Sequence, residues 1–290
     1  MRIAHITDLH FQSPPDVQDL LAPKRILGTV NLYLRGRVHH FDPKVQTALV
    51  NKCLDLNPDL VVVSGDLTAM STHSEHKKAY ELLKPMLDVL PCFIIPGNHD
   101  VYVKWGVPQA MKQFLGAWMG PQDPWIHQHE QTSVLHIETC RPHFLSRGWV
   151  SPEDLKKAEQ LIEGVPPDHF LFLCIHYPLF NRDGSPHTAY SRTISNGDIF
   201  RSWLAKQPRI DALLHGHEHH GYLTHYTTEE GTRPSINPGS SGYHEDLEKE
   251  RWAHFNLYTV DKRSLLSIER YRFKEDGFIL EEGGAYASGR

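Results

Sequence analysis

Carboxylate, amide and imidazole side chains follow five short apolar runs of this sequence, within a few residues of the end of each run. One run, Leu60–Val63, is followed by Gly65 and Asp66. These are the side chains that proteins offer to first-row metal ions, and the lack of thiolates among them favours Mn²⁺, Fe or Zn²⁺ over Cu(I) or an iron–sulfur cluster. The candidate residues are Asp8, His10, Asp66, Asn98, His99, Asp100, His176, His217 and His219.

The apolar runs themselves predict strands that deliver these side chains to one edge of a sheet. Leu60–Val63 has no polar alternation, which is typical of a strand covered on both faces of a layered α/β sheet. Gly65 permits a sharp turn, so Asp66 should emerge at the carboxyl end of the strand, where ligands of open α/β sheets bind. A lone aspartate there could equally be a cap or turn residue. The same pattern of an apolar run followed by candidate ligands occurs four more times, which favours metal chemistry. The other expected strands are Arg2–Ile6, Cys92–Ile95, Phe170–Ile175 and Ile210–Leu214.

Helices and further strands connect these runs. The patterns predict helices over Pro43–Leu56, Glu75–Leu90, Ser151–Glu163 and Phe200–Lys206, and antiparallel strands over Tyr222–Tyr226, His254–Val260 and Leu265–Phe273. Val101–Pro142 contains tryptophans among glycines and prolines and is expected to form loops and a short helix. Four histidines in and directly after this region are assigned no chemistry: His127, His129, His136 and His143. One domain over 1–290 is expected, with a cap or insertion at 13–41 and C-terminal antiparallel strands at 252–282.

The composition indicates a globular protein and argues against a general nucleic-acid-binding protein. The chain has 290 residues, of which 40% are hydrophobic and 22% charged, as in ordinary globular proteins. Its net charge of -5 argues against general nucleic-acid binding, which needs a basic surface. The four cysteines are isolated, as expected for buried thiols in a reducing compartment. No signal peptide or membrane span is visible, so we expect a cytoplasmic protein, or one peripheral to the inner membrane.

A basic, amphipathic stretch lies within the segment 13–41, which does not resemble core. Apolar residues at near-helical spacing alternate there with lysine and arginine over 24–40. Two interpretations remain open. The stretch is either a helix packed on the sheet with snorkelling arginines, or a cap beside the metal site that contacts an anionic or lipid-like substrate or a membrane surface.

The ordered motifs carry a family resemblance. They are Asp8-x-His10, Gly65-Asp66, Gly97-Asn98-His99-Asp100, His176 and Gly216-His217-Glu218-His219. In order and in strand-end context they resemble those of the calcineurin-like metallophosphoesterases, over about residues 1–245. Within that superfamily the chain is most similar to the bacterial class III cyclic-nucleotide phosphodiesterases.

The resemblance implies a fold and a ligand set. The fold is α/β, a four-layer α/β/β/α sandwich of two mixed sheets flanked by helices. Two divalent or trivalent ions, Mn²⁺ or an Fe/Mn or Fe/Zn pair, would share one edge. The implied ligands are Asp8, His10 and His219 for the first ion, Asn98, His176 and His217 for the second, and Asp66 for both. His99 would stabilise the transition state or protonate the leaving group, and Asp100 would help to orient it.

This ligand set suits phosphoester hydrolysis. Two ions about 3.5–4 Å apart supply a nucleophile at neutral pH and neutralise charge on the phosphoryl oxygens, so a metal-bridging hydroxide can attack phosphorus in line. Together with this chemistry, the resemblance to the cyclic-nucleotide phosphodiesterases implies a phosphodiesterase acting on a cyclic or other small nucleotide. The alternatives are a nucleotide-lipid pyrophosphatase of the UDP-diacylglucosamine type, motivated by 24–40, a phosphomonoesterase, or a catalytically silent scaffold. The sequence does not reveal the oligomeric state.

Overall fold

The structure, a computed structural model, describes residues 1–14, 25, 40–102, 107–143, 145–244, 246 and 251–287. Most of the expected cap at 13–41, and all of the basic stretch 24–40 except Arg25 and His40, lies outside these residues. The two interpretations of that stretch therefore stay predictions.

The first sheet contains the strands that precede Asp8, Asp66 and Asn98. Its order is β12-β11-β10-β1-β2-β3, with β1, β2 and β3 parallel and the remaining pairs antiparallel. The strands are β1 (Arg2–Ile6), β2 (Leu60–Val63), β3 (Cys92–Ile94), β10 (His254–Asp261), β11 (Ser264–Lys274) and β12 (Gly277–Leu280). The last three strands are thus antiparallel neighbours within 252–282.

The second sheet contains the strands that precede His176 and His217. Its order is β4-β5-β6-β7-β9-β8, with parallel pairing from β5 to β9 and antiparallel pairing at both ends. The strands are β4 (Trp125–His129), β5 (Thr132–His136), β6 (Phe170–Cys174), β7 (Ala212–Leu214), β8 (Tyr222–Thr228) and β9 (Gly231–Asn237). Both sheets are mixed, as expected.

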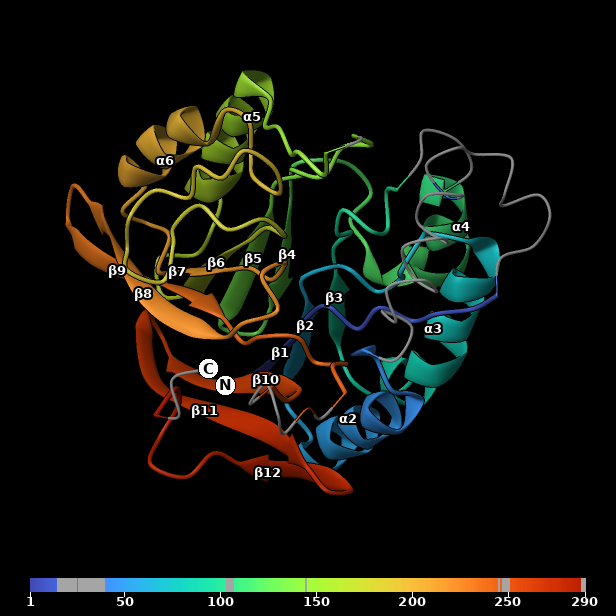
Figure 1. The fold of residues 1–290 in the computed structure, drawn as a ribbon. Coiled ribbons are helices and arrows are strands. Elements are labelled where there is room, and N and C mark those ends of the chain that lie inside the picture. Colours follow the sequence, from blue (N-terminus) through green and yellow to red (C-terminus); the bar gives the residue numbers. More distant parts are fainter. Residues whose placement is uncertain are drawn as a thin grey trace.

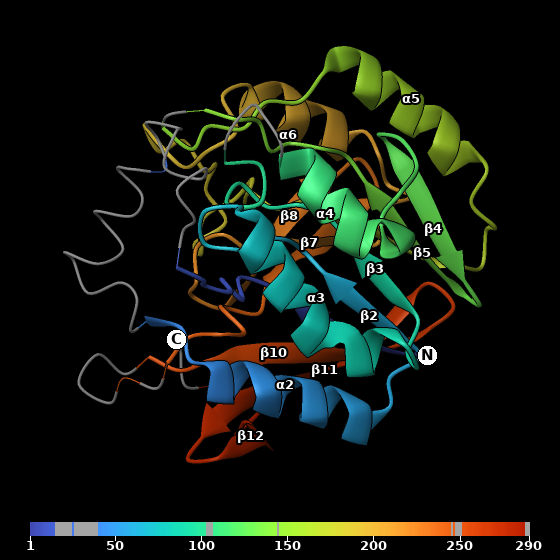
Figure 2. The same ribbon diagram turned by 90° about the vertical axis from the view of Figure 1, so that its right-hand side faces the viewer.

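Three apolar clusters hold the layers together, and they explain why the strands lack polar alternation. Leu60 and Val62 of β2 face the second sheet, where they join Phe172 and Leu214 in the cluster between the sheets. The intervening residues of β2 belong to the cluster that includes Leu49 of α2 (Pro43–Leu56), with α3 (His73–Leu87) and α4 (Val107–Leu115). A third cluster joins the second sheet to α5 (Pro152–Glu163) and α6 (Gly197–Ala205). The result is the expected four-layer α/β/β/α sandwich (Figure 1), with α2, α3 and α4 grouped on one outer face (Figure 2).

One sequence expectation was wrong, and one strand was not predicted. Val101–Pro142 contains α4, the 3₁₀ turn Gly116–Trp118 and the antiparallel hairpin β4–β5, rather than loops and a short helix. The hairpin is part of the second sheet because β5 pairs in parallel with β6. The stretch after Tyr226 also forms a strand, β9, which pairs with β7 despite containing Pro234. No helix among the described residues is long and apolar enough to cross a membrane.

Helix α3 begins earlier than expected because Thr72 and Glu75 form a capping box. Thr72 caps the helix, and the Glu75 carboxylate accepts the backbone N–H groups of Thr72 and Met70 at 3.1 and 2.9 Å. Glu75 is fully buried, and this burial raises the pKa of its carboxyl to about 7 against the opposing effect of those hydrogen bonds. The capping box therefore contains a carboxylate whose ionisation opposes folding.

This burial predicts a specific pH dependence of stability. Because the pKa of Glu75 is higher in the folded than in the unfolded chain, the folded state binds its proton more tightly, and the free energy of unfolding falls as pH rises from about 4.5 to about 7. Glu75→Gln keeps an acceptor without a charge. The free energy of unfolding of Glu75→Gln minus that of the wild type at the same pH should therefore increase by on the order of 3 kcal/mol from pH 4.5 to pH 8.

Urea unfolding of the EDTA-treated proteins at the two pH values measures this change. Glu81→Gln, on the exposed side of the same helix, is the matched control and should show no such trend. A difference between Glu75→Gln and wild type that is the same at both pH values would contradict the prediction.

Candidate metal centre

The strand-end loops place the candidate residues in an unusual backbone conformation. Positive φ angles occur at Asp8 (53°), His10 (46°), Asp66 (54°), His217 (74°) and His219 (57°). Such angles are uncommon for residues other than glycine, and they persist where the surrounding structure enforces them, often at functional sites. The loops of both sheets therefore hold their backbone in a conformation that the isolated segments would rarely adopt.

Close contacts between the loops that carry Asp8, Asp66 and Asn98 hold the backbone in this conformation. The N–H groups of Asp8 and His10 donate to the carbonyls of Gly65 and Asp66, each at 3.0 Å. A Cβ on Gly97 would overlap the backbone and carboxylate of Asp66, and a Cβ on Gly65 would overlap the backbone of Gly97. Glycine is thus required at both positions, because the Asp66 and Asn98 loops touch there.

Asp8, His10, Asp66 and His219 form the first cluster. Their candidate ligand atoms all lie within 4.8 Å of one another. His219 Nε2 lies 3.3 Å from Asp8 Oδ1 and 3.0 Å from His10 Nε2, and His10 Nε2 lies 3.7 Å from Asp66 Oδ2. Two imidazole nitrogens and two carboxylates therefore converge on one point, although their motifs are far apart in the sequence.

Asp66, His176 and His217 form the second cluster, again with candidate ligand atoms within 4.8 Å of one another. His176 Nε2 lies 3.2 Å from Asp66 Oδ2 and 3.2 Å from Asn98 Oδ1. The Nδ1–H of His176 donates to the Ser64 carbonyl at 2.8 Å, which directs its Nε2 toward Asp66. Asn98 thus lies beside the second cluster, and the Asp66 carboxylate is common to both clusters.

Buried charge dominates the electrostatics of these clusters. Burial alone would raise the pKa of Asp66, but His176 and His99 outweigh it and hold that pKa well below the usual range. The pKa of Asp8 is likewise lowered against the effect of burial, chiefly by His219 and His10. For His176, burial opposes protonation, yet Asp66 raises its pKa to about 9. Both carboxylates are therefore anionic at neutral pH and suited to holding cations.

Several buried polar atoms point to metal ions at these clusters. Within the described part of the chain, Asp8 Oδ1 and both ring nitrogens of His217 are buried and have no hydrogen-bond partner. Such orphaned atoms are costly unless an ion or another partner satisfies them. Carboxylates, imidazoles and an amide oxygen are the donor set that Mn²⁺, Fe and Zn²⁺ accept. The residues present therefore fit a pair of such ions.

His99 and Asp100 lie beside the clusters with different partners. The half-buried His99 donates its backbone N–H to Asp66 Oδ1 at 2.7 Å, and its ring Nδ1 lies 2.5 Å from the Ala69 carbonyl. Its ring centroid is 4.8 Å from that of His10. The fully buried Asp100 instead accepts backbone N–H groups of Leu67, Thr68 and Gly97 at 2.9–3.1 Å. Asp100 therefore acts on the backbone of the Asp66 loop.

Several side chains that support the site were not identified from the sequence, and four of them lie close to the candidate ligands or their loops. The ring centroid of Phe41 lies 4.4 Å from that of His10, and the ring centroid of Tyr177 lies 4.6 Å from that of His217. Asn237 Nδ2 donates to the Gly216 carbonyl at 2.8 Å, and Ser240 Oγ donates to the Asp8 carbonyl at 2.7 Å. For Asn237 and Ser240, the sequence signal was the Asn-Pro-Gly-Ser run at 237–240, because Asn and Ser side chains readily form hydrogen bonds to nearby backbone groups.

The polar loop 181–196 contacts the last motif. Its His187, which is buried, lies 3.5 Å from the carboxylate of Glu218 and 3.3 Å from Thr193 Oγ1. His215 is also buried and bonds through Nε2 to Ser235 Oγ at 3.1 Å. Both histidines therefore support the loop that carries His217 and His219.

Comparison with known proteins identifies the family of the chain and several relatives. The family model described as calcineurin-like phosphoesterase matches residues 1–221. A protein of Pseudoalteromonas sp. named "Probable cyclic nucleotide phosphodiesterase" is 25% identical over 224 residues, covering 77% of this chain and 72% of that protein. One of Arcobacter nitrofigilis named "Probable glycerophosphodiester phosphodiesterase" is 27% identical over 199 residues, covering 64% and 67%.

Solved structures share the fold. A dimetal phosphatase from Danio rerio superposes with a TM-score of 0.65 at 12% identity, covering 97% of this chain and 98% of that one. A purple acid phosphatase from yellow lupin superposes with a TM-score of 0.59 at 13% identity, covering 96% of this chain and 52% of that one. At such identities the likeness concerns the arrangement of layers and strands alone.

Proposed function

This chain belongs to the calcineurin-like phosphoesterase family of metal-dependent phosphoester hydrolases, and we propose that it is a two-metal phosphodiesterase acting on a cyclic or other small nucleotide. The observation that carries the proposal is the position of Asp66. Its carboxylate belongs to both clusters of candidate ligands, so one side chain can hold two ions at the short separation that phosphoester hydrolysis uses.

The ligand roles follow from the two clusters. Asp8, His10 and His219 would hold one ion, His176, His217 and Asn98 the other, and Asp66 both. We propose Mn²⁺ or an Fe/Mn or Fe/Zn pair as the ions. When bound, such a pair activates water as a nucleophile and neutralises charge on the phosphoryl oxygens.

The chain's own residues supply orientation and proton handling. His176 is directed by its Nδ1–H bond to Ser64, and the Asp66 loop is held by Asp100. A proton on His99 Nδ1 engages the Ala69 carbonyl, which makes Nε2 the nitrogen that exchanges a proton. The ring therefore carries protons on both nitrogens when it protonates a leaving group and keeps only the Nδ1 proton afterwards. We assign to His99 the protonation of the leaving-group oxygen or the stabilisation of charge on it. Asp100 is assigned a positioning role, through the backbone of the Asp66 loop.

The substrate class rests on the names of the relatives. The two relatives described above are named for diesters, one for cyclic nucleotides and one for glycerophosphodiesters. Asn98 contributes no charge to the second cluster, which eases the approach of an anionic diester. A cyclic or other small nucleotide is our first candidate, and glycerophosphodiesters are the competitors to assay beside it. The lipid-linked substrate and the membrane contact depend on 24–40, and we retain them as alternatives only.

Two experiments test the proposal: removal of the metal ions, and comparison of a phosphodiester with a phosphomonoester substrate. Protein stripped with EDTA should lose hydrolysis of bis(p-nitrophenyl) phosphate and regain it with added Mn²⁺, because the nucleophile depends on the ions. We expect the diester to be cleaved faster than p-nitrophenyl phosphate. The same preparations are then assayed with cyclic nucleotides and with glycerophosphodiesters. A preference for the monoester would make the protein a phosphatase, and activity unaffected by EDTA would refute the two-metal mechanism.

A further inference from the structure

A buried asparagine between the two sheets is the centre of a branched hydrogen-bond network. Asn256 of β10 is fully buried, and its Nδ2 donates to Tyr258 Oη at 3.1 Å and to Tyr286 Oη at 2.7 Å. Tyr286 Oη gives its proton to the Asn237 carbonyl, so the Asn256 group that faces it must be the amide nitrogen, which can only donate. Both phenols therefore accept from Asn256. Each phenol must therefore give its own proton to another partner, and this fixes the direction of two branches.

The first branch leads to His176. Tyr258 Oη lies 2.9 Å from His5 Nδ1, and His5 Nε2 lies 2.8 Å from Ser64 Oγ. Since the Tyr258 proton goes to Nδ1, the proton of the neutral His5 ring lies on Nε2 and is donated to Ser64. Burial lowers the pKa of His5 to about 3, which agrees with a neutral ring. The carbonyl of the same Ser64 accepts the Nδ1–H of His176 at 2.8 Å.

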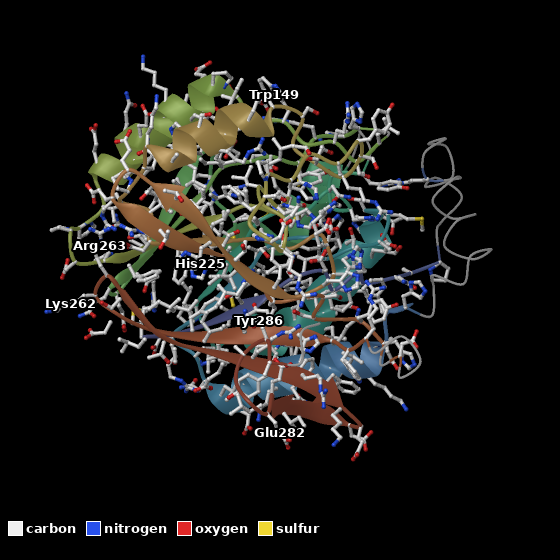
Figure 3. All side chains as sticks on the ribbon, turned by 60° about the vertical axis from the view of Figure 1, so that its left-hand side comes forward. Trp149, His225, Lys262, Arg263, Glu282 and Tyr286 are labelled. Atoms are coloured by element: carbon white, nitrogen blue, oxygen red, sulfur yellow. The ribbon has the colours of Figure 1, made fainter. Side chains whose placement is uncertain are left out.

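The second branch leads to His217 from the C-terminal segment. Tyr286 lies between the two sheets (Figure 3), and its Oη donates to the Asn237 carbonyl at 2.9 Å. Asn237 Nδ2 in turn donates to the carbonyl of Gly216, directly before His217. Tyr286 is held in place by the Arg270 guanidinium, 4.7 Å from its ring centroid, and by Glu281, whose carboxylate accepts its backbone N–H at 3.2 Å.

We propose that this network, made of Asn256, Tyr258, His5 and Tyr286, positions the two histidines of the second metal ion. The inference rests on the ligand roles proposed above for His176 and His217. Outer partners of this kind orient metal-binding histidines and affect metal affinity. Strand β10 and Tyr286 therefore act on the metal site, although neither contributes a candidate ligand among the described residues.

Removing single hydroxyl groups tests the two branches separately. Tyr258→Phe deprives His5 Nδ1 of its donor, so His5 can change tautomer and release Ser64. Tyr286→Phe removes the bond to the Asn237 carbonyl. Tyr271→Phe is the matched control: Tyr271 lies in the same sheet, on the helix side, and its hydroxyl bonds to Glu269 at 3.0 Å.

The measurement is Mn²⁺ binding to the EDTA-stripped proteins by calorimetry, with electron paramagnetic resonance to detect the coupled pair of ions. In Tyr258→Phe and Tyr286→Phe we expect the ion held by His176 and His217 to need about tenfold more Mn²⁺, with a smaller effect on the ion held by His10 and His219. Tyr271→Phe should bind like the wild type. A general loss of stability would not change the ratio of the two affinities, and excess Mn²⁺ should restore hydrolysis.

Two results separate failure of this inference from failure of the proposed function. If the wild type binds two ions and the Tyr258→Phe and Tyr286→Phe proteins bind them with the same two affinities, the network does not position the second site and the inference is overturned. If the wild type itself binds fewer than two ions, the proposed function fails, and this inference fails with it.

Discussion

Asp66→Ala is expected to lose both metal ions and nearly all hydrolysis. Asp66 belongs to both clusters of candidate ligands, so its removal takes an anionic ligand from each ion at once. The change also removes the acceptor of the His99 backbone N–H, which lies 2.7 Å from Asp66 Oδ1. We expect kcat/KM for bis(p-nitrophenyl) phosphate to fall more than about 10³-fold, beyond the loss caused by removing one charge-stabilising group.

Metal content and activity must be measured on the same Asp66→Ala preparation. Metal analysis after desalting should give close to two ions per wild-type chain and far fewer in the variant. Asp55→Ala, on the exposed face of α2, is the matched control and should retain both ions and full activity. Two tightly bound ions in Asp66→Ala would contradict a shared ligand. Asp66→Asn, which keeps the acceptor for the His99 N–H, separates loss of the anionic ligand from loosening of the loop.

His99→Ala is expected to leave both ions bound and to slow turnover by roughly 10²-fold or more. His99 lies against the first cluster, 4.8 Å from the His10 ring centroid, but its ring is absent from both groups of candidate ligands. A group that protonates the leaving oxygen matters most when that oxygen is basic. The loss should therefore be smaller for p-nitrophenyl esters than for an alkyl or nucleoside leaving group.

The comparison of two variants at His99 isolates its chemistry from its packing. His99→Asn retains a donor that can reach the Ala69 carbonyl but cannot serve as an acid, so it should be as slow as His99→Ala. Near-normal turnover in His99→Asn would mean that His99 serves only to hold the loop. Near-normal turnover in both variants, with both ions present, would refute any direct role.

The central strands were predictable because several of them, such as β2 and β6, are continuous apolar runs, while the four-layer arrangement was implied by the family resemblance. In β2 the side chains alternate between the cluster shared with the second sheet and the cluster shared with the helices, so every position must be apolar. The hairpin β4–β5 was not predicted, because its strands mix histidine, serine and glutamine with apolar residues. Its pairing with β6 depends on a neighbouring strand some 35 residues later, which local sequence does not encode.

The sequence by itself determined which side chains could bind metal and that most of them follow strands. The order of motifs, the residue types and the two glycines at Gly65 and Gly97 are all local properties of the chain. The family resemblance implied that His10 and His219 share an ion and that Asp66 serves both ions, but the residues alone could not show it. The nearness of these side chains depends on how the two sheets pack face to face.

Only the tertiary structure revealed the residues that contact the metal-site loops from the space between the two sheets. Asn256, Tyr258 and His5 look like ordinary strand residues in the sequence, and Asn237 looks like a turn residue. Their roles arise because buried polar groups must find partners, and in the space between the sheets the available partners belong to distant segments. Local sequence specifies the chemistry of a side chain, whereas its partners are set by contacts between segments far apart in the chain.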